Sequence, residues 1–304
     1  MRLLPLTKPK KYAKAWENSP TVTSGSARQI RTLTLQRLTE AGIENPAFEA
    51  QILLTMALSI SRATLLAEAF PEPTLEQRET LERLLLAREA RVPLAYLRGT
   101  QEFYGFSFRV SPAVLIPRPE TELLVDFALE KLQNAKNPRF IDVGIGSGCI
   151  AISVLKSLPH ALGVAVDLSA AALALAEENA VALEVQDRLR FIQGNLLSEV
   201  QDRVNLVLSN PPYIPSAEIP TLQPEVQCHE PHLALDGGAD GLVLIRELLV
   251  QARRNLEQEG WIALEVAQGQ AHSVEALLCH YGYANIATRC DLAGIPRMVF
   301  GQSL

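Results

Sequence analysis

The feature of this sequence that most constrains its fold is a regular alternation of short apolar runs with helix-like stretches in its second half. The apolar runs have the length and composition of buried strands and lie at residues 140–143, 162–166, 189–192, 204–208 and 261–265. One helix-like stretch begins at Cys149, a second runs through Ala180, and two more lie at 242–256 and 273–278. Such alternation predicts an α/β fold with a parallel, doubly wound sheet. We expect a last run, 298–300, to pair antiparallel at the edge.

The composition is that of a globular protein large enough for two domains. The chain has 304 residues, of which 48% are hydrophobic, and a mean hydropathy of +0.09. A net charge of −6 and a pI of about 5.5 argue against a broad basic surface for duplex nucleic acid. We therefore expect protein or small-molecule partners and no direct nucleic-acid binding.

The cysteines and the absence of export signals favour a reducing compartment. No C-x-x-C pair, zinc-finger spacing, secretory signal or long apolar span occurs in the sequence. We expect a cytoplasmic protein without a membrane partner. The segment 228–232 gathers cysteine, histidine and glutamate side chains, but we interpret it as a solvated loop and assign no metal site.

Composition and periodicity divide the chain into four parts. Residues 1–26 are rich in Lys and Arg and predict a disordered basic tail, with an organellar targeting peptide as the alternative. Residues 27–92 have apolar residues at helical spacing and predict a small helical domain, in which Thr74 and Gln77 suit a capping box. Residues 93–117 carry aromatic and β-branched runs and predict a β-hairpin linker. The α/β domain then occupies 118–304.

A glycine-rich loop follows the first strand of the α/β domain and precedes a helix. It comprises Gly144, Ile145, Gly146, Ser147 and Gly148. Its G-x-G-x-G spacing lacks the last glycine of the dinucleotide fingerprint, which favours S-adenosylmethionine over NAD. Asp167 ends the next strand, where a carboxylate can accept hydrogen bonds from ribose hydroxyls. The alternative is a turn or capping role before Ser169.

The run at 204–208 is followed by the tetrapeptide Asn210, Pro211, Pro212 and Tyr213. The prolines restrict the backbone and stiffen the carbonyl groups of this turn. Asn and backbone carbonyls can then hold the N–H groups of a planar nitrogen, and Tyr213 offers a face for stacking. Ligands of open α/β sheets bind outside the carboxyl ends of the strands, where this turn is expected. We interpret it as a device for methylating an amide or exocyclic amine, although Asn-Pro and Pro-Pro pairs are also ordinary loop sequences.

These motifs, together with residues 93–99, 115–122 and 291–297, resemble the HemK/PrmC family of protein-(glutamine-N5) methyltransferases over nearly the whole chain. The resemblance implies a helical domain that docks class 1 peptide chain release factors, a hairpin, and a Rossmann-like methyltransferase domain. The implied substrate is the glutamine of the Gly-Gly-Gln motif in the release factor. The implied cofactor is S-adenosyl-L-methionine.

The same resemblance assigns roles to individual residues. It implies cofactor contacts from the glycine loop, Asp167, Asn195, Leu196 and Asn210, whereas residues 210–213 also hold the target glutamine and carry catalysis. Asn195 stands where the family commonly has Asp, and Ile145 stands where Thr is frequent. The first departure puts the contact to adenine in doubt more than the activity. Glu120, Glu122 and Arg297 either support the site from behind or are capping and surface charges.

From these residues we expect an in-line transfer that needs no metal. The glutamine nitrogen attacks the sulfonium methyl group while Asn210 and the Pro211 carbonyl accept its hydrogens. Three alternatives stay open at this stage. They are a ribosomal-protein glutamine methyltransferase, an N6-adenine nucleic-acid methyltransferase, and a catalytically silent S-adenosylmethionine-binding module.

Overall fold

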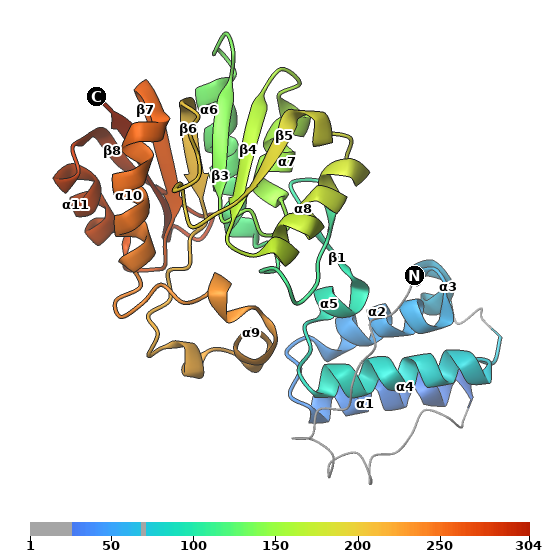
Figure 1. Cartoon of the computed structure of the whole chain (residues 1–304). Coiled ribbons are helices and arrows are strands. Elements are labelled where there is room, and N and C mark those ends of the chain that lie inside the picture. Colours follow the sequence, from blue (N-terminus) through green and yellow to red (C-terminus); the bar gives the residue numbers. More distant parts are fainter. Residues whose placement is uncertain (1–25, 68–70) are drawn as a thin grey trace. The chain divides into compact units, whose positions relative to one another are not determined.

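The computed structural model describes residues 26–67 and 71–304, so the predicted tail at 1–26 lies almost wholly outside the described residues. The chain divides into two compact units, Met1–Arg98 and Gly99–Leu304, here called the helical unit and the sheet unit (Figure 1). We expected boundaries near 93 and 118. The structure instead assigns the hairpin to the sheet unit. Within the described residues, no helix is long and apolar enough to cross a membrane.

The described part of the helical unit packs its helices around a leucine-rich core. These helices are α1 (Ala27–Glu40), α2 (Pro46–Leu58), α3 (Arg62–Leu66), α4 (Leu75–Glu89) and α5 (Leu94–Arg98). Thr74 begins α4 with the expected capping box, because its hydroxyl accepts from the Gln77 N–H and the Gln77 side chain accepts from the Thr74 N–H.

The sheet unit contains a hairpin and a seven-stranded sheet in the order β5-β4-β3-β6-β7-β9-β8. Its strands are β1 (Thr100–Phe103), β2 (Phe106–Arg109), β3 (Arg139–Val143), β4 (Leu162–Asp167), β5 (Leu189–Gln193), β6 (Val204–Ser209), β7 (Leu256–Glu265), β8 (Tyr283–Cys290) and β9 (Pro296–Ser303). Strands β3 to β7 are parallel, whereas β9 pairs antiparallel with β7 and β8. The antiparallel edge was expected for residues 298–300, but β8 was not predicted from the sequence.

Helices cover both faces of this sheet and give the unit three layers (Figure 1). The α-helices of the sheet unit are α6 (Glu122–Leu132), α7 (Cys149–Ser157), α8 (Ala170–Ala182), α9 (Pro224–His229), α10 (Val243–Asn255) and α11 (Ala271–His280). Helices α6 to α8 pack on one face, and α10 and α11 pack on the other. Alternate strand residues such as Phe140 and Ile141 enter the two separate cores, as expected for a sheet buried on both sides. The predicted Rossmann-like α/β class is confirmed.

A buried asparagine helps to hold the hairpin β1–β2 against the helices of the sheet unit. Asn179 of α8 accepts from the Arg109 N–H at 2.8 Å and donates to the Arg109 carbonyl at 3.0 Å. The same amide nitrogen lies 2.8 Å from the carbonyl oxygen of Ser147 in the glycine loop. A single asparagine thus ties the hairpin to the loop that follows β3.

Candidate active site

A cavity opens at the carboxyl ends of β3, β4 and β6, on either side of the point where the strand order reverses. Most of the residues singled out from the sequence line it, namely Gly144, Ile145, Gly146, Ser147, Asp167, Asn195, Leu196, Asn210 and Pro212. Gly148, Pro211 and Tyr213 do not line it. Open α/β sheets bind ligands at this place, because loops from neighbouring strands diverge there.

The glycine loop needs its glycines for two different reasons. Gly144 and Gly146 have φ of +78° and +53°, a left-handed conformation that side chains with a Cβ rarely adopt, and they leave the backbone open to the cavity. Gly148 has a φ of +84° and packs tightly, because an added Cβ would lie 2.7 Å from Ile152 Cδ1. The loop is held from below by the Val166 carbonyl, which accepts from the Gly144 and Ile145 N–H groups at 2.8 and 3.0 Å.

Asp167 joins the glycine loop to the helix that follows β4. One carboxylate oxygen accepts from the Gly146 N–H at 3.1 Å, and the other accepts from the Ser169 N–H at 2.9 Å. Ser169 in turn caps α8. Burial raises the pKa of the Asp167 carboxyl, although these backbone hydrogen bonds oppose the rise. Asp167 therefore has a turn role, and as a cavity residue it is also open to a ligand.

The tetrapeptide after β6 is packed closely on its outer side. Ser209 Oγ donates to the Val143 carbonyl at 2.7 Å, which joins the ends of β6 and β3. Gln270 Nε2 donates to the Tyr213 carbonyl at 2.8 Å. Gly241, with a φ of +73°, approaches the same carbonyl so closely that an added Cβ would lie 2.2 Å from its oxygen. Side-chain hydrogen bonds thus hold the turn at both ends, and the close approach at position 241 admits only glycine.

A chain of hydrogen bonds runs from Asn210 and Thr121, which line the cavity, to Glu265 and Tyr213, which do not. Asn210 Nδ2 donates to Thr121 Oγ1 at 3.2 Å, and Thr121 Oγ1 lies 2.6 Å from Glu265 Oε2. The Tyr213 hydroxyl donates to Glu265 Oε1 at 3.1 Å. Burial raises the pKa of the Glu265 carboxyl to about 7, with the two hydroxyls acting in the opposite direction. Asn210 and Tyr213 are therefore connected through one buried carboxyl.

Sequence reasoning missed the roles of Thr121 and Glu265 in this chain. Thr121 was only part of the proline-rich motif at 115–122, and Glu265 only ended a predicted strand. A usable signal was present, since Glu265 ends the strand that follows the tetrapeptide and its helix in a parallel sheet. Carboxyl ends of adjacent parallel strands meet at one edge, which places Glu265 beside the tetrapeptide.

The three charged residues of undecided role lie differently. Glu122 accepts from the Tyr104 N–H at 2.8 Å and so holds the hairpin turn. Arg297 Nε donates to Asp291 at 3.1 Å and acts on Glu265 only electrostatically. Glu120 raises the pKa of Glu265 by its negative charge, a smaller effect than burial. None of the three lines the cavity.

The segment 228–232 is attached to the proline-rich segment at 115–122 through Glu230. Glu230 is buried, forms an ion pair with Arg118, and accepts from the Ile116 N–H at 3.3 Å. Within residues 26–67 and 71–304, no group of three or more His, Cys, Asp or Glu side chains is arranged to hold a metal ion. Pro231 and Leu233 line the cavity, so this loop supplies part of its wall.

Two family descriptions match the chain in the order of its two units. Residues 29–99 match the PrmC N-terminal domain, and residues 121–223 match the Methyltransferase small domain. The hMettl16 catalytic domain, solved in complex with the MAT2A 3'UTR hairpin 6, has a TM-score of 0.54 and 14% identity over 65% of this chain and 76% of that chain. The same domain with hairpin 1 has a TM-score of 0.51 and 17% identity, covering 72% and 80%. These likenesses show the fold alone.

Sequence relatives go further. The release factor glutamine methyltransferase of Bradyrhizobium diazoefficiens is 41% identical over 286 residues, covering 93% of this chain and 96% of that protein. The release factor glutamine methyltransferase of Geobacter sulfurreducens is also 41% identical, over 90% and 96%. Identity at this level over nearly the full length confirms the resemblance first seen in the motifs. The chain therefore belongs to the family of release factor glutamine methyltransferases and is an S-adenosylmethionine-dependent methyltransferase.

Proposed function

We propose that this enzyme transfers a methyl group from S-adenosyl-L-methionine to the side-chain amide nitrogen of the glutamine in the Gly-Gly-Gln motif of class 1 peptide chain release factors. The observation that carries this proposal is the placement of Asn210 on the cavity wall. Its amide nitrogen is engaged by Thr121, and its side-chain oxygen accepts no hydrogen bond from the described residues. An unengaged carbonyl oxygen is what a substrate N–H requires. Relatives named for release factor glutamine methylation support the choice of substrate.

The cavity residues suit S-adenosylmethionine. The open backbone at Gly144 and Gly146 allows close approach of the methionine part, and the Asp167 carboxylate lies where ribose hydroxyls would donate. Leu168 and Leu196 offer apolar surface to an adenine, and Asn195 offers an amide to its amino group. The bound cofactor would supply an electrophilic methyl group on a positively charged sulfur. Gly148 would act by packing α7 against the loop.

The tetrapeptide would orient and activate the amide. The lone pair of an amide nitrogen is delocalised, so the nitrogen reacts only when its hydrogens are held and the developing positive charge is stabilised. Asn210 Oδ1 would accept one of those hydrogens. The Pro211 carbonyl, which stands between the cavity-lining residues Asn210 and Pro212 and accepts no hydrogen bond from the described residues, would accept the other. Pro212 and Tyr213 would fix the turn and flank the substrate. The amide nitrogen held in this way would form its new bond to the methyl group as the methyl group left the sulfur, and the nitrogen would lose its proton to solvent afterwards.

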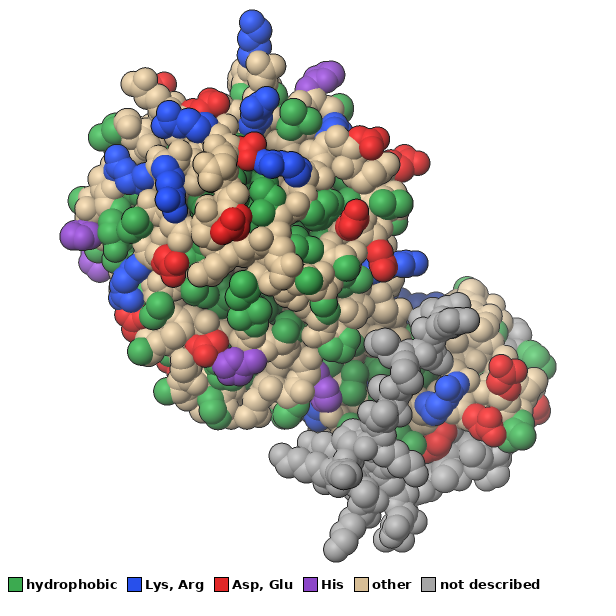
Figure 2. Space-filling view, in the orientation of Figure 1, with side chains coloured by type: hydrophobic (Ala, Val, Ile, Leu, Met, Phe, Trp, Pro, Cys, Tyr) green, Lys and Arg blue, Asp and Glu red, His purple; other side chains and the backbone are tan. Residues whose placement is uncertain are grey.

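A nucleic-acid substrate has less support. On the face shown in Figure 2, acidic and basic side chains are interspersed over the sheet unit, and the helical unit displays several acidic side chains. A duplex or a structured RNA needs a cluster of cations to neutralise its phosphates. A protein substrate in the cytoplasm fits this surface better.

The experiment is mass spectrometry of an unmethylated release factor after incubation with the enzyme and S-adenosylmethionine. We expect one added methyl group, located by fragmentation on the Gly-Gly-Gln glutamine. A release factor with that glutamine replaced by glutamate is the control and should gain none. A ribosomal protein and an RNA are incubated in parallel. Methylation of either one in place of the release factor would refute the proposed substrate, and tight cofactor binding without any transfer would favour the silent binding module.

A further inference from the structure

Glu265 carries a buried carboxyl group that takes no direct part in the proposed transfer reaction. It lies at the carboxyl end of β7, is only 3% exposed, and does not line the cavity. Its position is fixed by the register of the sheet, because Leu264 pairs with Ser209 on one side and Glu265 pairs with Met298 on the other. It therefore lies directly behind the turn that begins at Asn210.

The charges around Glu265 leave it without a direct counter-ion. Arg297 is bonded to Asp291, and Arg118 of the proline-rich segment is paired with Glu230. Glu120 adds a like charge, and the remaining ionisable groups near it are Tyr213 and the buried thiol of Cys149. In the described part of the chain, its two oxygens are satisfied only by the neutral hydroxyls of Thr121 and Tyr213. A buried carboxylate in such surroundings is costly and calls for an explanation.

The hydrogen bonds have a direction that depends on the ionisation of Glu265. An ionised carboxylate is an acceptor only, so Thr121 must donate its single hydroxyl hydrogen to it. The Thr121 oxygen can then only accept from Asn210, which must present its NH₂ group. The carbonyl oxygen of Asn210 is left for the cavity. A protonated carboxyl can donate to Thr121 instead, after which Thr121 can donate to Asn210 and the amide can turn over.

We propose that the ionised form of Glu265 is the positioning device that keeps the Asn210 carbonyl oxygen facing the substrate amide, acting through the hydroxyl of Thr121. This inference rests on the proposed function and deepens it. In the reversed orientation Asn210 would present a donor to the substrate N–H groups, which cannot accept it. The enzyme would then bind both substrates but transfer methyl slowly. Glu265 is thus a positioning residue, whereas Asn210 contacts the substrate.

The test is the pH dependence of single-turnover methyl transfer to a release factor, at saturating S-adenosylmethionine, for the full-length wild-type enzyme and E265Q. For the wild type, the rate should rise between about pH 6 and about pH 8, since the glutamine amide itself does not titrate in this range. E265Q should show a flat profile and a lower rate than the wild type at the upper end. Its affinity for S-adenosylmethionine, measured by calorimetry, should be unchanged. The control is Glu257→Gln, an exposed glutamate on the same strand, which should keep the wild-type profile.

A second pair of variants keeps the inference testable should E265Q fold poorly. Thr121→Ser retains the hydroxyl and should retain the rate and its pH profile. Thr121→Val removes the hydroxyl at nearly constant size and should slow transfer by about 100-fold, as expected when a reacting group loses its alignment. An E265Q enzyme with the wild-type rate and profile, or a Thr121→Val enzyme with the wild-type rate, would overturn the inference. Absence of transfer by the wild type at every pH would instead refute the proposed function.

Discussion

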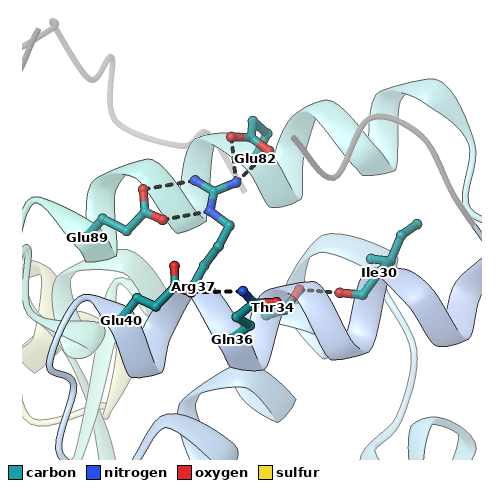
Figure 3. Close-up of polar contacts among 7 residues, drawn as sticks. All are labelled: Ile30, Thr34, Gln36, Arg37, Glu40, Glu82 and Glu89. Carbon is teal, nitrogen blue, oxygen red and sulfur yellow. Dashed lines mark hydrogen bonds and ion pairs between the residues drawn. The ribbon is translucent and has the colours of Figure 1, made fainter. Parts of the chain in front are cut away.

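Arg37 of the helical unit and Glu265 of the sheet unit are both buried, but they have opposite kinds of partner. In the helical unit, Arg37 of α1 is 2% exposed and lies between Glu82 and Glu89 of α4, with nitrogen-to-oxygen distances of 2.7 and 2.6 Å (Figure 3). In the sheet unit, Glu265 is bonded to neutral hydroxyls. Burial alone would lower the pKa of Arg37, but hydrogen bonds to the two glutamates raise it. The pKa of Glu265 is shifted against ionisation, and so is that of Asp142 beneath the glycine loop.

This difference separates a structural role from a functional one. A buried charge with opposite charges on both sides holds two helices together and does not titrate near neutral pH. A buried acid satisfied only by hydroxyls is held at a cost in stability and is poised to change its protonation. Strongly shifted groups of the second kind cluster at functional sites. The comparison predicts that the two charges respond to mutation in opposite directions.

The largest expected loss of stability comes from Arg37→Met. This change leaves Glu82 and Glu89 side by side without their common counter-charge, at 15% and 21% exposure. We expect a loss of about 3–5 kcal/mol in the free energy of unfolding of the helical unit. Urea unfolding followed by hydrogen exchange measures the two units separately. A loss below about 1 kcal/mol, as found for exposed ion pairs, would contradict the structural role.

The opposite sign is expected for E265Q. The folded-state pKa of Glu265 is raised from 4.5 to about 7, so the folded protein binds this proton more tightly than the unfolded chain. Stability is therefore lost as pH rises from the unfolded pKa towards the folded pKa, and this loss amounts to roughly 3 kcal/mol above about pH 7. E265Q cannot ionise and should lack this pH-dependent loss.

The measurement for E265Q is urea unfolding of wild type and variant across the acid-to-neutral range. The difference in unfolding free energy should move in favour of E265Q as the pH rises through the window between 4.5 and about 7. Glu257→Gln again serves as the control. A difference that does not change with pH would show that Glu265 titrates normally.

The smallest expected effect is a loss of stability confined to the helical unit. Thr74→Ala removes the side-chain half of the capping box at the start of α4. We expect a loss of about 1 kcal/mol in the helical unit and no change in the rate of methyl transfer. Thr74→Ser keeps the hydroxyl and should restore most of the stability. A change in transfer rate at saturating substrate would show that the integrity of α4 affects catalysis.

Much of the fold could be predicted because local patterns were consistent with the tertiary structure. The strands β3 to β7 carry short, mainly apolar runs, and the capping box at Thr74 depends only on residues three apart. Strand β8 was missed because its residues after the buried Tyr283 are exposed or half-buried, lack such a run, and depend on pairing with β9. The helix α9 was likewise missed within a proline-rich loop.

The motifs allowed several cavity residues to be identified from the sequence. The hydrogen bonds behind them depend on which strands are neighbours in the sheet. The ends of parallel strands bring the first four residues of the glycine loop, together with Asp167, Asn195, Leu196, Asn210 and Pro212, to one cavity. The link from Asn210 through Thr121 to Glu265 spans 89 and then 144 residues of sequence. No local pattern reports contacts over such separations. The roles assigned to all of these residues, and to Tyr213, in holding substrate and cofactor stay predictions.

The proposed role of Asn210 in holding the substrate amide is tested most directly by a single-turnover assay of Asn210→Ala. With S-adenosylmethionine and release factor both saturating, the rate should fall by about 10²–10³-fold. This is the loss seen when one preorganised polar contact is removed from an active site. Cofactor affinity should be close to that of the wild type. Asn205→Ala is the matched control, because Asn205 lies near the start of β6 whereas Asn210 follows its end. This variant should transfer methyl at the wild-type rate. An Asn210→Ala enzyme that transfers methyl at the wild-type rate would show that Asn210 does not activate the substrate amide.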